Sequence, residues 1–287
     1  MIQRIAVFGA GLMGAGIAQV SAQGGFQVVM VDVSPEFLDK GVYKIHQNLE
    51  KRVEQGKLAA EEMKKVLTRI RMETTPELAA KDCDFVIEAV PEMMNLKIEL
   101  FQKLDKICRP GIIFATNTSA LSITEMAKAI GRPEQFIGMH FFNPVPAMRL
   151  VEIVRGLNTS DSTAQEAAEV VRKMGKEVVS VKESPGFVTT RMNALIGNEA
   201  FHMLQEGIAS AEDIDKALKL GLNHPMGPFE LVDLVGLDTR LNVLKFLHER
   251  LGEKYRPSPL LEKYVKEGRL GRKSGRGVYD YSEKKSG

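Results

Sequence analysis

The sequence predicts an α/β protein, with a doubly wound sheet domain over residues 1–184 followed by an all-helical C-terminal domain over residues 185–287. In the first half, short β-branched runs alternate with segments of helical periodicity, a pattern typical of a parallel sheet covered by helices. The breaker Ser184-Pro185-Gly186 ends this alternation. Beyond it, apolar residues recur only at helical spacing. At 287 residues the chain is also longer than one typical domain.

The expected strands are short and rich in β-branched residues. They cover residues 5–8, 27–31, 85–89, 112–115, 136–140, 151–154 and 177–181. Between the second and third of these, Ser34 and Pro35 predict a helix start, with the serine as N-cap and the proline at the first helical position. In the second domain we expect helices over residues 187–205, 210–220 and 228–251, the second of them opened by a capping box of Ser210 and Asp213.

Charge and cysteine content narrow the class of protein. A net charge of +2, from 39 basic and 37 acidic residues, is too balanced for a nucleic-acid-binding protein. Cys83 and Cys108 lie outside any metal-ligand spacing, so we expect reduced cysteines and no metal. No segment approaches the 18 or so apolar residues of a membrane span. The sequence therefore favours a cytoplasmic protein with no membrane partner.

A glycine-rich turn joins the first strand to the first helix. Its sequence is Gly9-Ala10-Gly11-Leu12-Met13-Gly14. In such a motif the first glycine permits the turn, the second lets backbone approach a pyrophosphate, and the third allows helix and strand to pack closely. Asp32 ends the second strand, where a carboxylate can accept hydrogen bonds from both ribose hydroxyls and repel a 2′-phosphate. These features predict a site for NAD rather than NADP. The alternative is a purely structural turn beside a solvated aspartate.

Two polar clusters follow later strands of the predicted sheet. Asn117-Thr118-Ser119 comes after one strand, and His140 closes the next. Histidine titrates near neutrality, so it suits a general base, although an isolated histidine is more often a hydrogen-bonded core residue. Glu152 lies in an apolar run, where an ionised carboxylate needs a partner. We expect it to pair with His140. The alternative places Glu152 on a solvated edge, paired with Arg149 or Arg155.

Several segments together resemble one family closely. They are GAGLMGAGIA, EAVPE, NTSALSI, GMHFFNPVPAMRLVEIV, HPMGPFELVDLVGLD and GRKSGRGVYDY, and they span the chain from end to end. The sequence resembles the L-3-hydroxyacyl-CoA dehydrogenases, especially the bacterial stand-alone 3-hydroxybutyryl-CoA type. The resemblance implies a Rossmann-like NAD domain and a helical domain that forms a homodimer. It also implies reversible oxidation of (S)-3-hydroxyacyl-CoA, of short chain, to 3-oxoacyl-CoA in fatty-acid or related acyl-CoA metabolism.

The resemblance also implies roles for individual residues. The base would be His140, its orienting carboxylate Glu152, and the substrate-binding serine Ser119. Contacts to NAD would come from the glycine turn and from Asp32, Glu92, Lys97, Ser119, Asn143 and Lys273. Without the resemblance, Glu92 is equally a helix-start acid, Lys97 a solvated lysine and Lys273 part of a surface turn.

Basic residues on and beyond the helix that begins near Pro35 suit the phosphates of coenzyme A. The resemblance matches Lys51 and Lys57 to basic positions near that end of the substrate, and Lys44 and Arg52 lie on the same helix. The alternative is an ordinary solvated helix face.

The chain departs from the family at one position. The family reads Asn-Arg where this sequence has Thr190-Arg191, so the amide that helps hold the substrate's reacting oxygen is replaced by a hydroxyl on a shorter arm. Asn193, one helical turn later, is a second candidate for this substrate contact. We expect Thr190 to take the role.

Two other functions remain open on the sequence alone. One is a dehydrogenase of free hydroxy acids or sugar acids, with the same base and no coenzyme A. The other is a non-catalytic NAD-binding protein. The pairing of His140 with Glu152 argues against the second, because a sensor needs only the glycine turn and Asp32.

Overall fold

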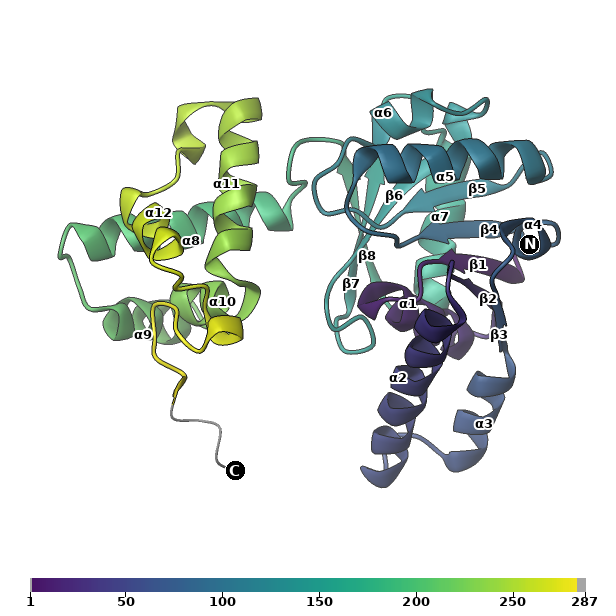
Figure 1. Ribbon diagram of the computed structural model, residues 1–287, viewed down its shortest axis with the longest axis horizontal. Helices are drawn as coiled ribbons and strands as arrows, with labels where there is room; N and C mark the ends of the chain where they lie inside the picture. The colour runs from purple at the N-terminus through teal and green to yellow at the C-terminus, as the bar shows by residue number, and fades with distance from the viewer. Residues whose placement is uncertain (1, 283–287) are drawn as a thin grey trace. The chain divides into compact units, whose positions relative to one another are not determined.

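The computed structural model describes residues 2–282, which form two compact units that divide between Ser184 and Pro185 (Figure 1). Within the described residues, no helix has both the length and the apolar character that crossing a membrane requires.

The first unit is built on a sheet with the strand order β3-β2-β1-β4-β5-β6-β7-β8. The strands are β1 (Arg4–Phe8), β2 (Gln27–Val31), β3 (Ile70–Glu73), β4 (Phe85–Glu88), β5 (Ile113–Thr116), β6 (Phe136–Phe141), β7 (Leu150–Arg155) and β8 (Glu177–Lys182). The strands from β3 across to β6 pair in parallel. The order reverses beside β1, which is where ligands bind in open sheets of this kind.

The sheet differs from the prediction in two places. β7 runs antiparallel to β6, so the expectation of a parallel sheet is wrong there. The connection of residues 142–149 is shorter than the dozen or so residues that a parallel crossover needs. The strand β3 was not predicted. It is a four-residue edge strand in which Arg71 and Met72 are exposed. Such a short, polar strand lacks the apolar alternation by which strands are recognised.

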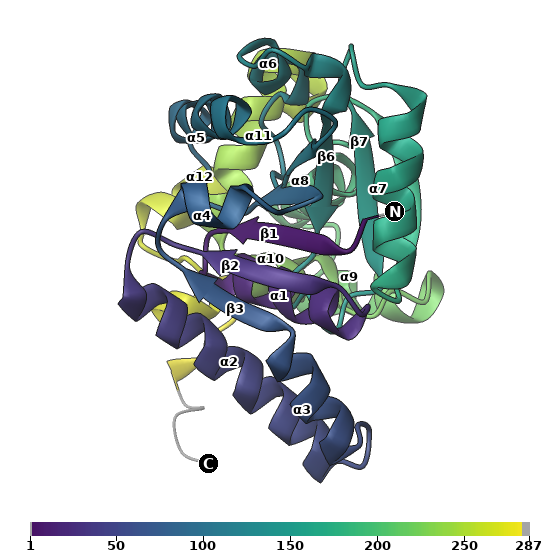
Figure 2. The same ribbon diagram turned by 90° about the vertical axis from the view of Figure 1, so that its right-hand side faces the viewer.

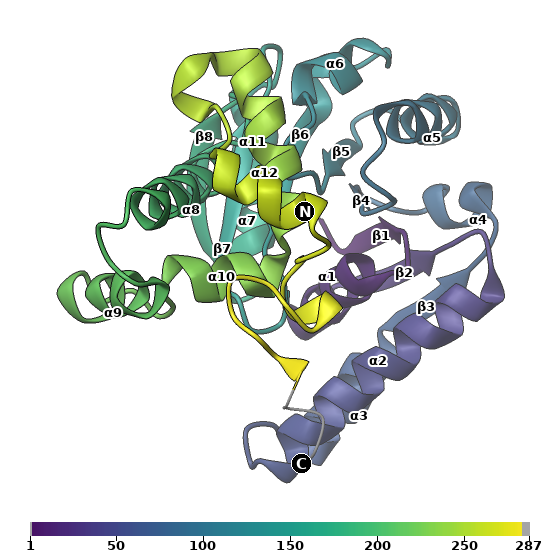
Figure 3. The same ribbon diagram turned by 60° about the vertical axis from the view of Figure 1, so that its left-hand side comes forward.

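Helices cover both faces of this sheet. They are α1 (Leu12–Gln23), α2 (Pro35–Glu54), α3 (Ala60–Thr68), α4 (Pro76–Ala80), α5 (Met94–Ile107), α6 (Ile123–Lys128) and α7 (Asp161–Lys173), with a 3₁₀ turn at Pro133–Gln135. Strands β6 and β7 lie between α5 and α7 (Figure 2). Helices α2 and α3 form an arm that extends from the edge carrying β3 (Figure 3).

Apolar stripes hold these helices on the sheet. Leu38, Ile45 and Leu49 of α2 are buried in the same core as the side chains of β1 and α1. Each such side chain contributes about 1.5–3 kcal/mol of burial free energy. The predicted cap is confirmed, because the Ser34 hydroxyl accepts the N–H of Glu36 at 3.2 Å. On the opposite face Phe101 of α5 packs edge-on against Phe136 of β6.

The second unit is helical. It contains α8 (Thr189–Gln205), α9 (Ala211–Gly221), α10 (Pro228–Val235), α11 (Leu237–Leu251) and α12 (Pro259–Lys266), with 3₁₀ turns at Glu253–Tyr255 and Arg272–Ser274. The expected helix over residues 228–251 is divided at Gly236, whose φ of 109° leaves the helical region. Ser210 caps α9 by accepting the N–H of Asp213. The Asp213 carboxylate returns to the serine hydroxyl rather than to its backbone, so the capping box is incomplete.

A buried aspartate fixes the chain after α12. Asp233 of α10 is fully buried and accepts the N–H groups of Val278 and Tyr279 and the hydroxyl of Tyr281. A Cβ added at Gly277 would overlap the Asp233 carboxylate. These contacts explain Gly277 and Tyr281 in the segment GRGVYDY.

Candidate active site

The glycine turn between β1 and α1 has the geometry of a phosphate cradle. A Cβ at Gly9 would overlap the carbonyl of Ala89, and one at Gly14 would overlap the carbonyl of Gly9, so both positions require glycine. At Gly11 nothing lies within 4 Å of the added Cβ. That open space suits the backbone approach of a pyrophosphate. Helix α1 has no side-chain cap, so its first N–H groups and the positive end of its dipole are available to a phosphate at this turn.

Asp32 lies beside this turn. Its Oδ2 accepts the N–H of Ala10 at 2.7 Å and its Oδ1 accepts the N–H of Val33 at 2.8 Å. A carboxylate has about four acceptor positions, so two hydrogen bonds leave room for hydroxyl donors. The residues present therefore fit the ribose and pyrophosphate of a dinucleotide without a 2′-phosphate.

His140 and Glu152 occupy directly opposite positions on β6 and β7. Their side chains share one face of the sheet, and Nδ1 of the imidazole lies 2.7 Å from Oε2 of the carboxylate. Glu152 is fully buried and His140 is 5% exposed. The surface alternative for Glu152 is wrong, since Arg149 pairs with Glu177 and Arg155 with Asp161.

Ser119 completes a line of three polar groups. Its Oγ lies 3.1 Å from Nε2 of His140, on the side of the ring away from Glu152. The ring of Phe142 packs against the imidazole with centroids 4.4 Å apart. A carboxylate at Nδ1 favours the tautomer protonated there, and in that tautomer Nε2 carries the lone pair that can accept a proton. Ser119 itself is exposed, so this end of the line is open to an incoming molecule.

A buried ion pair lies under the loop that carries Ser119. Nζ of Lys97 donates to Oε1 of Glu88 at 2.6 Å and lies 3.3 Å from Glu92, and both Lys97 and Glu88 are fully buried. The interpretation of Lys97 as a solvated lysine is therefore wrong. Burial raises the pKa of Glu88, and the Lys97 ammonium acts against that shift. Sequence reasoning missed Glu88, although an acid at the end of the apolar run Phe85–Glu88 carries the same signal that identified Glu152.

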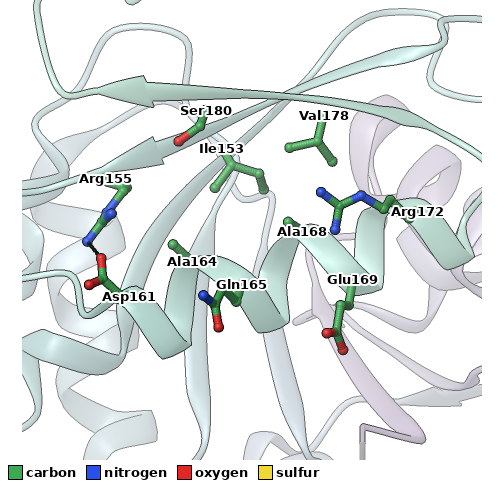
Figure 4. Close-up of a pocket in the computed structure, with 10 residues that line it drawn as sticks. All are labelled: Ile153, Arg155, Asp161, Ala164, Gln165, Ala168, Glu169, Arg172, Val178 and Ser180. Atoms are coloured by element: carbon green, nitrogen blue, oxygen red, sulfur yellow. Dashed lines mark ion pairs between the residues drawn. The ribbon is translucent and has the colours of Figure 1, made fainter.

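The first unit also has a hollow of about 380 Å³ on the other face of the sheet, between β7, β8 and α7 (Figure 4). Ile153 lines it, and because neighbouring side chains of a strand point to opposite faces, Glu152 points away from it. Its charges are of both signs, and Arg155 pairs with Asp161 at one end. The hollow is thus separate from the line of Ser119, His140 and Glu152.

Family models match both units. Residues 4–184 match the NAD-binding domain of 3-hydroxyacyl-CoA dehydrogenase, and residues 186–281 match its C-terminal domain. The chain belongs to the 3-hydroxyacyl-CoA dehydrogenase family. Its first unit is accordingly an NAD-binding domain, as the glycine turn and Asp32 predicted.

Relatives of this dehydrogenase family match the whole chain. A probable 3-hydroxybutyryl-CoA dehydrogenase of Bacillus subtilis is 51% identical over 99% of both chains. The mitochondrial hydroxyacyl-coenzyme A dehydrogenase of Homo sapiens is 42% identical, over 98% of this chain and 92% of the relative. The crystal structure of (S)-3-hydroxybutyryl-CoA dehydrogenase from Ralstonia eutropha superposes with a TM-score of 0.96 at 45% identity, covering 99% of this chain and all of the other.

The structure also places the remaining residues that the dehydrogenase family implies. Asn143 is exposed and precedes a cis peptide bond to Pro144 in the β6–β7 connection. In the second unit, Lys273 is half-exposed and pairs with Asp238 at 2.6 Å. Thr190 and Asn193 are half-buried near the start of α8 and, three residues apart, share one face of it.

The basic residues matched to coenzyme A are accessible. Lys44 and Lys51 are exposed on α2, and Lys57 is exposed just beyond Gly56. Arg52 is half-buried near the end of the same helix. The solvated helix face therefore remains an alternative for Lys51 and Lys57.

Proposed function

We propose that this chain catalyses the reversible, NAD-dependent oxidation of (S)-3-hydroxyacyl-CoA to 3-oxoacyl-CoA, with 3-hydroxybutyryl-CoA as a substrate, in fatty-acid or related acyl-CoA metabolism. One observation carries the proposal: the imidazole of His140 lies between a buried carboxylate at Nδ1 and an exposed hydroxyl at Nε2. Membership of the dehydrogenase family supports the substrate class.

In the oxidation, Nε2 of His140 takes the proton of the substrate's 3-hydroxyl as the carbon–oxygen double bond forms. NAD, which the glycine turn and Asp32 would hold, would supply the hydride acceptor for the same carbon. Glu152, 2.7 Å from Nδ1, stabilises the imidazolium that results. The hydroxyl of Ser119 positions the substrate oxygen beside Nε2, and Thr190 supplies a second donor.

The proposal extends to coenzyme A and to assembly. Lys51 and Lys57 bind phosphates of coenzyme A, since both are exposed and cationic. The protein acts in the cytoplasm, which agrees with two buried, free cysteines. It forms a homodimer through the second unit. Large apolar side chains of that unit remain exposed, among them Ile208, Leu220, Leu222 and Leu234.

A panel of substrates tests this function. Purified protein is given NADH with acetoacetyl-CoA, with longer and dicarboxylic 3-oxoacyl-CoA esters, and with free acetoacetate, and NADH oxidation is followed. We expect acetoacetyl-CoA to be reduced and the free acid to be left unchanged. The His140→Ala variant is the control, with turnover lower by about 10²–10⁴. Equal turnover of acetoacetate and its thioester would show instead a dehydrogenase of free acids.

A further inference from the structure

Glu88 is a buried carboxylate for which the proposed reaction has no use. It ends β4, with Phe8 of β1 on one side and Thr116 of β5 on the other. Its Oε1 accepts the N–H of Val90 at 2.7 Å and Nζ of Lys97 at 2.6 Å, and its Oε2 accepts the Thr116 hydroxyl at 2.5 Å.

From this carboxylate, hydrogen bonds continue to the loop that carries Ser119. The N–H of Asn117 donates to the Glu88 carbonyl at 2.7 Å, and Nζ of Lys97 donates to the Asn117 carbonyl at 3.4 Å. Lys97 also pairs with Glu92, whose Oε1 accepts the N–H of Ser119 at 3.0 Å. Glu88 is thus linked to the backbone of Ser119 through one lysine and one carboxylate.

The same loop is tied to the strand of the base. Oδ1 of Asn117 accepts the N–H of Phe141, the residue after His140, at 3.0 Å. If Lys97 lost Glu88, its ammonium would remain fully buried with Glu92 as its nearest carboxylate. Because an unpaired buried charge is costly, Lys97 would then draw Glu92 away from Ser119.

We propose that Glu88 is a positioning residue of the reaction: it holds Lys97, and through Lys97 and Glu92 it keeps the hydroxyl of Ser119 beside Nε2 of His140. This inference rests on the proposed function, in which Ser119 and His140 meet the substrate. It assigns to the first acid of the EAVPE segment a role distinct from that of the second, Glu92.

A double-mutant cycle tests the inference. We compare kcat and KM for acetoacetyl-CoA in the unmodified protein, Glu88→Gln, Ser119→Ala and the double variant. Glu88→Gln keeps the shape and removes the charge, and we expect it to lower kcat about tenfold in the unmodified background. In the Ser119→Ala background we expect the same change to have almost no effect on kcat, because the hydroxyl that it misplaces is already gone.

Asp105→Asn is the matched control. Asp105 lies on α5 with Lys97, and its carboxylate pairs with Arg132 at 2.6 Å, away from the Ser119 loop. The same acid-to-amide change there should leave kcat unchanged in both backgrounds. If Glu88→Gln does not fold, Glu88→Asp, which keeps the charge on a shorter side chain, enters the cycle in its place.

Independent losses from Glu88→Gln and Ser119→Ala, multiplying in the double variant, would overturn the inference and leave the proposed function standing. If Ser119→Ala and His140→Ala both retain full turnover, the proposed function fails and this inference fails with it. An unaltered kcat in Glu88→Gln would overturn the inference about Glu88.

Discussion

The proposed chemistry requires the negative charge of one residue, Glu152. Glu152→Gln retains the shape of the side chain and removes the anion that stabilises an imidazolium at His140, so we expect kcat to fall by about 10²–10⁴. The loss is measured with saturating NADH and acetoacetyl-CoA. Circular dichroism and thermal unfolding establish that the variant is folded. Turnover near that of the unmodified protein would assign Glu152 a structural role only.

We expect Asp32 to govern the choice between NAD and NADP. Asp32→Ala should raise KM for NAD by about 10–100-fold, the effect of losing a hydrogen bond to a charged group, and should narrow the preference over NADP. Asp32→Asn is the matched variant, because it keeps an acceptor for the N–H of Ala10 and removes only the charge that repels a 2′-phosphate. A native enzyme that uses NADPH better than NADH would contradict this assignment.

Thr190 and Asn193, near the start of α8, are the two candidates for one proposed substrate contact. We expect Thr190→Val, which removes the hydroxyl at nearly constant volume, to lower kcat by about tenfold, since an oxygen left without its donor loses about 1–3 kcal/mol. KM for NAD should hardly change. Asn193→Ala is then nearly silent. The opposite result assigns the contact to Asn193, and full activity in both variants assigns it to neither.

The residues of the candidate site differ in how far the sequence reveals them. Glu152 could be paired with His140 because an acid in an apolar strand needs a partner. The two residues are twelve positions apart, and the two prolines between them allow the chain to turn back. Lys97 could not be placed, because a single lysine near a helix start has no periodicity to show burial. Its partner Glu88 ends β4, and the turn from β4 into α5 brings the two side chains together.

At the scale of elements, local patterns identify those with strong apolar periodicity. The interiors of β1, β2 and β4 and the cap of α2 follow from β-branched runs and from Ser34-Pro35. The antiparallel direction of β7 does not, since it depends on where the chain returns in space. The edge strand β3 does not either, because its short, polar sequence lacks apolar alternation. Gly236 divides a helical pattern without altering its apolar periodicity. Its φ of 109° is a conformation that glycine permits, but the presence of a glycine does not by itself predict it.

Lys176 joins the α7–β8 turn to the β6–β7 connection. Its buried Nζ donates to the carbonyls of Val145 at 2.7 Å and Met148 at 2.6 Å, and burial lowers its pKa below the ordinary 10.5. Between the lowered folded value and 10.5, the unfolded chain binds more protons at this position than the folded chain does. The contribution of Lys176 to the free energy of unfolding therefore rises with pH across this window and is lost as pH falls through the folded pKa.

Lys176→Met should remove this dependence. We expect the difference in free energy of unfolding between the unmodified protein and the variant to widen as pH is raised toward 10.5. Urea unfolding at a series of pH values measures it. Lys173→Met, at the end of α7, is the control for the loss of a lysine side chain. A constant difference for Lys176→Met would show that its charge is equally favoured in both states.

At the scale of the molecule, each unit has its own apolar core, and the second also leaves apolar side chains exposed. If a homodimer forms there, introducing a like charge at its apolar contacts should separate the protomers. We expect Leu220→Glu/Leu222→Glu to sediment as a monomer at concentrations where the unmodified protein sediments as a dimer. Leu157→Glu, an equally exposed leucine of the first unit, should leave the dimer intact. A dimer that survives the double change lies on another surface.

The alignment of β6 with β7 has a consequence for how the protein can be studied. Because side chains alternate along a strand, a slip of one residue would turn Glu152 to the face that carries Ile153 and leave His140 without its acid. Only one of the possible alignments is therefore active. Recovered turnover after dilution from denaturant then counts molecules with correctly aligned strands, whereas circular dichroism counts every molecule that has formed a sheet. The lag between the two signals would measure how long misaligned sheets persist.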